Sequence, residues 1–290
     1  MQEIDQISNL GRRGGSWLPN IELQININMP MNSFVRRVGT FLLQLGVDPR
    51  RLYASFRFIP SYLLGILQLR NSLNQSNKAP FSLHWLPILS DRYMASGVAQ
   101  GHYFHQDLWA ARHVYAQHPR RHVDIGSRID GFVAHLLVFR EVEVLDVREL
   151  KSAVSGLHFR QADLMLAGSV DTSTTDSLSC LHALEHFGLG RYGDPINADG
   201  WYTGLQNLAY MLCNAGRLYL SVPVGPQVIE YNAQRIFAPG TIVDAAHTLG
   251  LALVEFSYVD DTGVFHEKCH IDEASACQFG CGCYVFERVS

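Results

Sequence analysis

Residues 122–132 have the sequence HVDIGSRIDGF, and this stretch decides the fold. A short apolar run typical of a strand ends in Asp124, glycines follow at Gly126 and Gly131, and a helix-like segment begins near Phe132. Glycines let the backbone turn sharply and approach a ligand, and in open α/β sheets the ligand lies at the carboxyl ends of the strands. The stretch therefore predicts a strand–turn–helix unit with a ligand site at its turn.

The next predicted strand supplies an acid that fits the same kind of site. It has the sequence VEVLD and ends in Asp146, 22 residues after Asp124. An acid in this place can accept hydrogen bonds from the two hydroxyls of a ribose. The glycine turn and the acid together indicate an adenosine-binding α/β domain, although a structural turn and a surface acid would give the same pattern.

Strand-like and helix-like runs alternate from residue 101 onward. Apolar runs typical of strands occur at 121–125, 142–146, 177–181, 216–223, 251–258 and 283–289, and helix-like runs at 105–118, 131–139, 200–213 and 240–250. This alternation predicts a mostly parallel sheet with helices on both faces, and the last strand, after a long connection, is expected to be an antiparallel edge strand. We expect residues 101–290 to form this domain and residues 1–100 to form a helical or irregular extension.

The composition is that of a globular protein. Of 290 residues, 47% are hydrophobic and 17% are charged, which argues against a disordered or fibrous chain. No apolar run approaches the ~20 residues that span a bilayer. The first residues, MQEIDQIS, show no secretory signal, so we expect a cytoplasmic protein with reduced thiols.

Charge is distributed unevenly along the chain. Residues 1–80 carry a net charge of +5 and the remainder −9, which speaks against a protein devoted to nucleic acid. The basic front end includes the apolar stretch 53–69, which could contact the inner face of an anionic membrane or a charged glycan. A solvated helical face explains the same residues.

The cysteines near the C-terminus do not have the spacing of a zinc knuckle. Cys269, Cys277, Cys281 and Cys283 follow the pattern C-x7-C-x3-C-x-C, without paired C-x2-C units, although His266 and His270 are close in sequence. Cys283 also begins a strand-like run. The spacing therefore argues against a structural zinc site built from these cysteines.

The turn at 124–131 resembles motif I of class I S-adenosylmethionine-dependent methyltransferases, in which glycines follow an acid at intervals of two. The resemblance extends over residues 101–290 through QAD at 161–163, DSLSCLHALEHFG at 176–188 and NLAYMLCNAGRLYLSVPVG at 207–225. Over the longer strings 101–148, 176–195 and 218–237 the chain is identified as a member of domain-of-unknown-function family 268, which is methyltransferase-like. This implies a three-layer Rossmann-like fold with a mostly parallel seven-stranded sheet and an antiparallel last strand.

The resemblance implies S-adenosylmethionine as cofactor. It places the cofactor beside the motif I turn, the acids that follow the second and third strands, and the helix that precedes the first strand. The implied cofactor-binding residues are His105, Gln106, Asp124, Gly126, Ser127, Arg128, Gly131, Asp146 and Asp163. Arg128 departs from the motif because it stands where the second glycine is expected. Its side chain could crowd the methionine moiety or pair with its carboxylate. A non-catalytic nucleotide-binding or scaffold protein on a degenerate methyltransferase fold would look the same.

His182, Glu185 and His186 are the candidate catalytic residues. Their spacing of i, i+3 and i+4 puts them on one face of a helix, and the motif is similar to E-x-x-E-H in metal-dependent O-methyltransferases. The three would then be metal ligands as well, and the first histidine would favour Zn²⁺, Mn²⁺ or Fe²⁺ over Mg²⁺. His186 is the preferred general base. A packed histidine and a capping acid would also explain the motif.

The predicted function is O-methylation of a sugar hydroxyl in a polysaccharide or glycolipid, since the candidate pocket is polar and no aromatic-rich acceptor region is evident. Arg191 and Tyr192, in a glycine-rich loop, and Asn232, after the fifth strand, are the candidate acceptor contacts. The sequence gives no indication of the oligomeric state.

Overall fold

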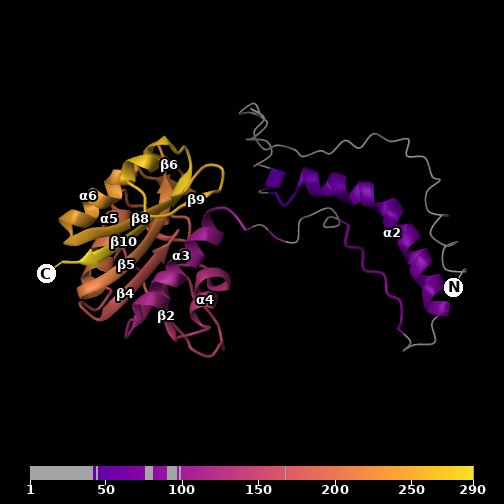
Figure 1. Cartoon of the computed structure of the whole chain (residues 1–290), viewed down its shortest axis with the longest axis horizontal. Helices are drawn as coiled ribbons and strands as arrows, with labels where there is room; N and C mark the ends of the chain where they lie inside the picture. The colour runs from indigo at the N-terminus through magenta and orange to yellow at the C-terminus, as the bar shows by residue number, and fades with distance from the viewer. Residues whose placement is uncertain are drawn as a thin grey trace, which may run out of the picture. The chain divides into compact units, whose positions relative to one another are not determined.

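The computed structural model describes residues 42–43, 45–75, 81–89, 97, 99–166 and 168–289 (Figure 1). The chain divides into two compact units, Met1–Gly97 and Val98–Ser290. In the first unit, helix α2 (Pro49–Gln75) begins directly after Asp48, whose carboxylate accepts a hydrogen bond from the backbone N–H of Arg51. Asn32 and Ser33 in the sequence also predict a cap for a helix over residues 34–46, a segment that lies largely outside the described residues. Among the described helices, none has the length and apolar character needed to cross a membrane.

The second unit contains an eight-stranded sheet with the order β3-β2-β1-β4-β5-β10-β8-β9. Its strands are β1 (His122–Ile125), β2 (Val142–Asp146), β3 (Leu157–Gln161), β4 (Thr175–Leu181), β5 (Leu212–Val224), β8 (Leu251–Val259), β9 (Phe265–His266) and β10 (Gly280–Arg288). Strands β1 to β5 pair in parallel, and β10 pairs antiparallel with both β5 and β8. The predicted mostly parallel sheet with an antiparallel last strand is confirmed, but the sheet has eight strands and not seven, because the two-residue β9 pairs with β8.

The position of the last strand differs from the prediction. Strand β10 does not lie at the edge but is inserted between β5 and β8, and the short β9 occupies that edge instead. Residues 280–286 of β10 are all buried. Both hydrogen-bonding sides of β10 are paired, so it presents none of the unpaired N–H and C=O groups of an edge strand.

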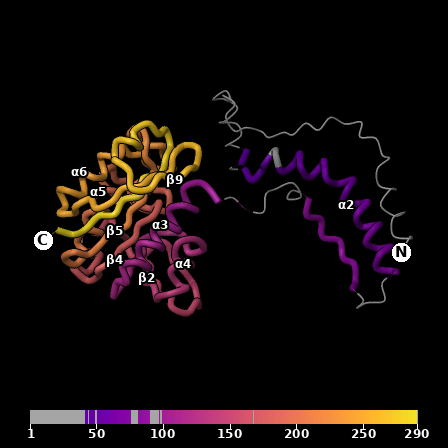
Figure 2. The backbone as a smooth tube through the Cα atoms, in the orientation of Figure 1, coloured from indigo at the N-terminus to yellow at the C-terminus, as the bar shows by residue number. Residues whose placement is uncertain are grey.

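Helices cover both faces of the sheet, as predicted (Figures 1 and 2). One apolar cluster joins the sheet to α3 (His102–Gln117), a π-helical turn (Ile129–Val133) and α4 (Ala134–Leu136). A second cluster joins it to α5 (Gly200–Met211) and α6 (Pro239–Thr248). The remaining elements are a hairpin of β6 (Val228–Glu230) and β7 (Gln234–Ile236) and two short 3-10 turns, Leu184–His186 and Ile271–Ala276.

This topology gathers polar side chains at one edge of the sheet. Asp146 ends β2, Asp163 follows β3, and His182 follows β4. Because these strands are parallel, their carboxyl ends meet at the same edge. The antiparallel β10 begins where they end, since Cys281 pairs with Pro223 near the end of β5.

Gly282 in β10 has a packing reason to be glycine. A Cβ atom there would lie 2.7 Å from Cγ1 of Val224 and 2.8 Å from the ring of Tyr284, both buried. We expect Gly282→Ala to lower the free energy of unfolding by about 1–3 kcal/mol in urea unfolding followed by circular dichroism. The control is Gly240→Ala in α6, where no atom lies within 4 Å, and it should leave stability unchanged or slightly raised. Equal stability of the two variants would contradict this packing.

Candidate active site

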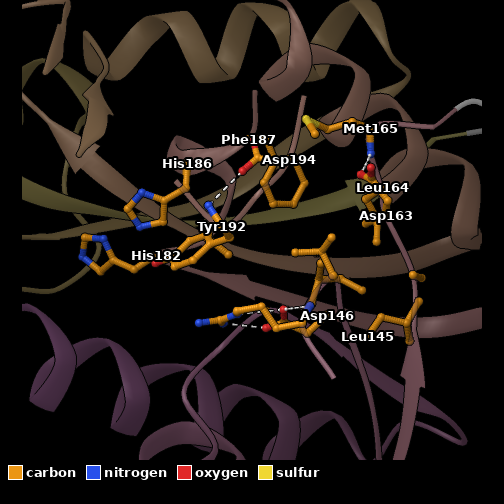
Figure 3. Close-up of a pocket in the computed structure, with 16 residues that line it drawn as sticks. Leu145, Asp146, Asp163, Leu164, Met165, His182, His186, Phe187, Tyr192 and Asp194 are labelled. Atoms are coloured by element: carbon orange, nitrogen blue, oxygen red, sulfur yellow. Dashed lines mark hydrogen bonds and ion pairs between the residues drawn. The ribbon is translucent and has the colours of Figure 1, made fainter. Parts of the chain in front are cut away.

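A pocket that is partly open to solvent lies at the carboxyl ends of β1 to β4 (Figure 3), and its empty volume, with the open solvent included, is about 570 Å³. His182 and His186 lie at one end of it, and Asp163, Leu164 and Met165 lie at the other. Asp146 lines the space between them. The pocket is therefore elongated, with a polar, imidazole-bearing end and an apolar end next to an acid.

Gly126 forms part of the pocket wall at the turn after β1. Its φ of +67° is a left-handed conformation that favours glycine, and its N–H donates to the carbonyl of Leu145. A Cβ atom would lie 3.1 Å from that of Ala183, which follows β4. Glycine thus lets the β1 turn approach the segment after β4 closely, and the predicted role of Gly126 at the site agrees with its place.

Asp124 holds the turn from beneath and does not line the pocket. It is fully buried, and its carboxylate accepts hydrogen bonds from the hydroxyls of Ser127 (2.6 Å) and Ser179 (2.5 Å) and from the N–H of Ser127. Burial raises its pKa to about 6, although these hydrogen bonds favour the charged form. Asp124 and Ser127 therefore shape the turn: Asp124 does not reach the pocket, and Ser127 lines a neighbouring pocket that shares Asp146 with it.

Arg128 and Gly131 also lie outside the lining of this pocket, although Arg128 lines a neighbouring pocket that shares Asp146 and Arg148 with it. The Arg128 guanidinium pairs with Asp130 at 2.9 Å and lies over the ring of Tyr103, 5.1 Å from its centroid. A Cβ atom on Gly131 would overlap the carboxylate of Asp107 in α3. Arg128 therefore does not crowd the pocket, and Gly131 allows α3 to pack against the turn.

The two residues predicted to close the pocket from the preceding helix have other contacts. The His105 ring stacks on Phe265, with centroids 5.4 Å apart. Gln106 is buried, and its Oε1 accepts a hydrogen bond from the hydroxyl of Ser221 at 2.5 Å. That hydroxyl in turn accepts from the N–H of His182. Gln106 thus supports the backbone after β4, and neither residue lines the pocket.

Asp146 carries an ion pair that the sequence did not suggest. Arg148, two residues later, donates from Nε to Oδ1 (3.0 Å) and from Nη2 to Oδ2 (2.7 Å). The guanidinium also lies 4.4 Å from the ring centroid of Tyr192. Asp163 accepts the N–H of Met165 at Oδ1. Both acids line the pocket as predicted, and Arg148 partly occupies the oxygens of Asp146.

His182, Glu185 and His186 do not share a helix face. His182 has a φ of +49°, which ends the strand in a turn, and residues 184–186 form only a 3-10 turn before Gly188, at φ +77°. The helical expectation was wrong because these two positive φ angles leave no room for a helix. The turn nevertheless brings the side chains together: Glu185 Oε1 lies 2.7 Å from Nδ1 of His182 and 3.8 Å from Nε2 of His186.

Hydrogen bonds place a proton on Nδ1 of both imidazoles. A carboxylate and a carbonyl can only accept, so Nδ1 of His182 donates to Glu185 and Nδ1 of His186 donates to the carbonyl of Ala233 at 2.7 Å. Burial lowers the pKa of His186, so that its Nε2 is an unprotonated lone pair at neutral pH. Burial would also lower the pKa of His182, but Cys281 and Glu185 raise it instead.

The predicted ligand trio does not form a metal-binding group. Within the described part of the chain, one set of three side chains has ligand atoms that all lie within 4.8 Å of one another. It contains His182, but the other two members are neither Glu185 nor His186.

The loop after the 3-10 turn covers one end of the pocket. The Asp194 carboxylate accepts the N–H groups of Gly188, Gly190 and Tyr192 and so fixes the loop. Tyr192 lines the pocket, as an acceptor contact would. Arg191 instead donates to the Ala233 carbonyl at 2.9 Å. Asn232 is exposed and outside the pocket lining, contrary to its predicted place.

Arg235 is a structural support that the sequence analysis missed. It is 4% exposed, and its guanidinium donates to the carbonyls of Glu185, Phe187, Asn197 and Ala198. It therefore fixes the backbone of the turn that carries Glu185 and His186. No local signal in the sequence indicated this role, because Arg235 stands among polar residues such as Asn232 and Gln234, and a buried arginine draws its several acceptors from distant segments.

Residues 132–263 match the profile of a family described as Caenorhabditis protein of unknown function, DUF268. No curated protein matches the chain significantly. Among solved structures, the chain is similar to a proposed sarcosine dimethylglycine methyltransferase from Galdieria sulphuraria (12% identity, 64% of this chain and 86% of that one, TM-score 0.48).

Two further structures contain S-adenosylhomocysteine. One is a 1,6-didemethyltoxoflavin-N1-methyltransferase from Burkholderia thailandensis (14% identity, 64% and 79% covered, TM-score 0.45). The other is the N-methyltransferase NodS from Bradyrhizobium japonicum (14% identity, 76% and 98% covered, TM-score 0.44). The strand order and the reversed β10 are those of the class I methyltransferase fold.

The buried carboxyl of Asp124 predicts a pH dependence of stability. Its pKa is raised from 3.8 to about 6, so the folded chain holds this proton more tightly than the unfolded chain. The resulting stabilisation is present below pH about 4 and is lost as the pH rises through about 6. In urea unfolding, the stability of Asp124→Asn relative to the unsubstituted chain should therefore rise by about 1–3 kcal/mol between pH 4 and 7.

The control for this measurement is Asp130→Asn. The pKa of Asp130 is lowered by its hydrogen bond and ion pair with Arg128, so its pH dependence should have the opposite sign. If the Asp124→Asn difference were flat across this range, the carboxyl would not be buried as described.

Proposed function

We propose that this chain, which belongs to the DUF268 family over residues 132–263, is an S-adenosylmethionine-dependent methyltransferase that methylates a hydroxyl group. One observation carries the proposal. A single pocket is lined by the glycine turn after β1, the acids after β2 and β3, and the imidazole of His186 after β4. Cofactor and base would thus share one cavity.

The residues present fit the cofactor. Gly126 leaves the wall bare where an adenosine would approach, Asp146 can accept from ribose hydroxyls, and Asp163 retains Oδ2 for the adenine amine. Leu145, Ala162 and Leu164 provide apolar surface for the base. When bound, S-adenosylmethionine supplies an electrophilic methyl group on a sulfonium centre.

His186 is the proposed general base. Its Nδ1–H donates to the Ala233 carbonyl, which directs the lone pair of Nε2 away from that contact. Its lowered pKa keeps it unprotonated at neutral pH, ready to accept a hydroxyl proton. Tyr192 packs edge-on against the ring at 5.7 Å, and Arg191 holds the same carbonyl, so both would orient the base and border the acceptor.

We infer that the acceptor is a sugar hydroxyl of a glycan or glycolipid. An imidazole base suits a hydroxyl, and the neighbouring tyrosine and arginine side chains offer the polar and ring surfaces on which saccharides bind. Helix α2 adds a basic and apolar surface that fits an anionic membrane, with Arg51, Arg57 and Arg70, no acid, and exposed Leu63 and Leu67. Such a contact would bring the chain to lipid-linked acceptors at the cytoplasmic face.

A second candidate is a non-catalytic scaffold on this fold. The observation that favours it is the ion pair of Arg148 with Asp146, which occupies the oxygens proposed for the ribose. Binding of the cofactor would have to displace this guanidinium or share Asp146 with it.

Two substitutions with opposite effects test the cofactor site. In calorimetric titration with S-adenosylhomocysteine, Asp146→Ala should weaken binding by roughly 10–100-fold, because it removes a charged acceptor worth about 1.5–3 kcal/mol. Arg148→Gln should tighten binding by about 2–5-fold, because an exposed ion pair is worth no more than about 1 kcal/mol.

The control is Asp244→Ala, an exposed acid in α6 outside the pocket, which should bind like the unsubstituted chain. A chain that takes up no S-adenosylhomocysteine, with or without Arg148, would support the scaffold instead.

The catalytic proposal is tested with labelled cofactor and a panel of glycans, proteins and small phenols. Label should appear in the glycan fraction; label only in protein would contradict the acceptor class.

With the responding glycan, His186→Ala should lower turnover by roughly 10²–10⁴-fold while cofactor affinity stays unchanged. Since the pKa of His186 is lowered, activity should fall only on the acid side of pH 6.5. A fully active, folded His186→Ala chain would remove the imidazole from the mechanism.

A further inference from the structure

Three side chains from distant parts of the sequence meet beside the pocket. His102 begins α3, His182 follows β4, and Cys281 lies near the start of β10. One ligand atom from each lies within 4.8 Å of the other two, and within the described part of the chain this is the one group of three with that property. Donors on one tetrahedral zinc ion lie about 3.4–3.6 Å apart, given Zn–N and Zn–S lengths of about 2.1 and 2.3 Å. Movements on the order of 1 Å would therefore close the group around an ion.

The environment of His182 points to a ligand. Its side chain is 6% exposed, and Nδ1 donates to the carboxylate of Glu185 at 2.7 Å. The opposite nitrogen, Nε2, is buried and has no hydrogen-bond partner among the described residues. Buried polar atoms are rarely left unpaired. A histidine that donates one N–H to a carboxylate and presents the other nitrogen without a partner has the arrangement of a metal ligand and its supporting acid.

Cys281 and His102 complete the donor set. Cys281 is fully buried, and its sulfur makes long contacts: 3.8 Å to Oε1 of Gln106, 3.9 Å to the sulfur of Cys283 and 4.0 Å to the carbonyl of Gly282. The ring of His102 lies parallel to that of His182, with centroids 5.3 Å apart, so one ring has to tilt before both nitrogens can point at the same ion. Two imidazoles and a thiolate are the donors of Zn²⁺ and similar soft cations, whereas Mg²⁺ and Ca²⁺ require oxygen ligands.

We propose that His102, His182 and Cys281 bind one Zn²⁺ ion, with Glu185 as the positioning residue behind His182. The ion displaces the thiol proton of Cys281 and any proton on the two imidazole nitrogens, and these protons pass to solvent. Three protein ligands leave a fourth position for water or for a donor atom of a substrate, as in catalytic rather than structural zinc sites. His182 also lines the pocket, so the metal site adjoins the space proposed for methyl transfer. Of the three metal ligands predicted from the sequence, His182 remains a ligand, whereas His102 and Cys281 take the places of Glu185 and His186.

The test uses the full chain, stripped with a chelator and titrated with Co²⁺ as a coloured substitute for Zn²⁺. We expect one ion per chain, with the absorption of tetrahedral Co²⁺ and a thiolate-to-cobalt charge-transfer band, both abolished by added Zn²⁺. Cys281→Ala should remove the charge-transfer band, and His102→Gln should weaken binding at least 10-fold. Zn²⁺ should raise the melting temperature of the unsubstituted chain and not that of Cys281→Ala.

Matched controls are available for both substitutions. Cys213→Ala changes a half-buried cysteine at the opposite end of β5, and His105→Gln changes a half-buried histidine of α3 that stacks on Phe265. Both should bind Co²⁺ like the unsubstituted chain. Should the Cys281→Ala chain fail to fold, His102→Gln decides, because this residue is only half-buried at the first position of its helix.

Absence of stoichiometric binding, or a charge-transfer band that survives Cys281→Ala, would overturn the proposal. The measurement needs neither cofactor nor acceptor. Binding of Zn²⁺ without binding of S-adenosylhomocysteine would support the metal site and contradict the proposed methyltransferase function. Binding of S-adenosylhomocysteine without binding of Zn²⁺ would contradict the metal site and leave the proposed function standing.

Discussion

The buried carboxylate of Glu185 determines how the imidazoles at the pocket are used. Its Oε1 accepts the Nδ1–H of His182, which directs Nε2 of that ring toward His102 and Cys281. The same oxygen faces Nε2 of His186 at 3.8 Å, too far for a hydrogen bond, so that nitrogen keeps its lone pair. A buried charge of this kind persists only with partners, because an unpaired one costs several kcal/mol. The contacts of Glu185 thus give the two histidines different roles: His182 is arranged as a metal ligand and His186 as a general base.

The backbone around Glu185 is fixed by a second buried charge. Arg235 donates to four carbonyls on two segments, including that of Glu185 itself. Together with the Asp194 carboxylate, which holds three N–H groups of the following loop, it replaces the hydrogen bonds that a helix would have provided. A short turn can therefore present His182, Glu185 and His186 in fixed positions without a regular element beneath them.

The architecture could be predicted from the sequence, and so could the part of the pocket that is formed by the ends of β1, β2 and β3. The glycine turn at 126 and the acids at 146 and 163 were predictable because each follows its own strand, and parallel strands bring their ends together. The interior position of β10 was available as well, since GCGCYVF lacks the polar alternation of an edge strand. It was missed because the strand follows a long connection and its order in the sheet is not local information.

The rest could not be read from spacing. Glu185 was expected on a helix face, and only the positive φ of His182 shows that the chain turns there instead. Asp124 has the residue type of a cofactor contact, but its role depends on Ser179, which is 55 residues away. His102, His182 and Cys281 span most of the domain, so no motif connects them. The bidentate pairing of Arg148 depends on a side-chain conformation that composition cannot reveal.

A crystal structure of the full chain grown with S-adenosylhomocysteine tests the central claim most directly, that the pocket at the ends of β1 to β4 is a cofactor site facing a histidine base. The account predicts density for the ribose at Asp146, the base beside Asp163, and the sulfur toward His186, with Arg148 moved from at least one oxygen of Asp146. An empty pocket with the Arg148–Asp146 pair unchanged, or the ligand bound elsewhere on the chain, would contradict it.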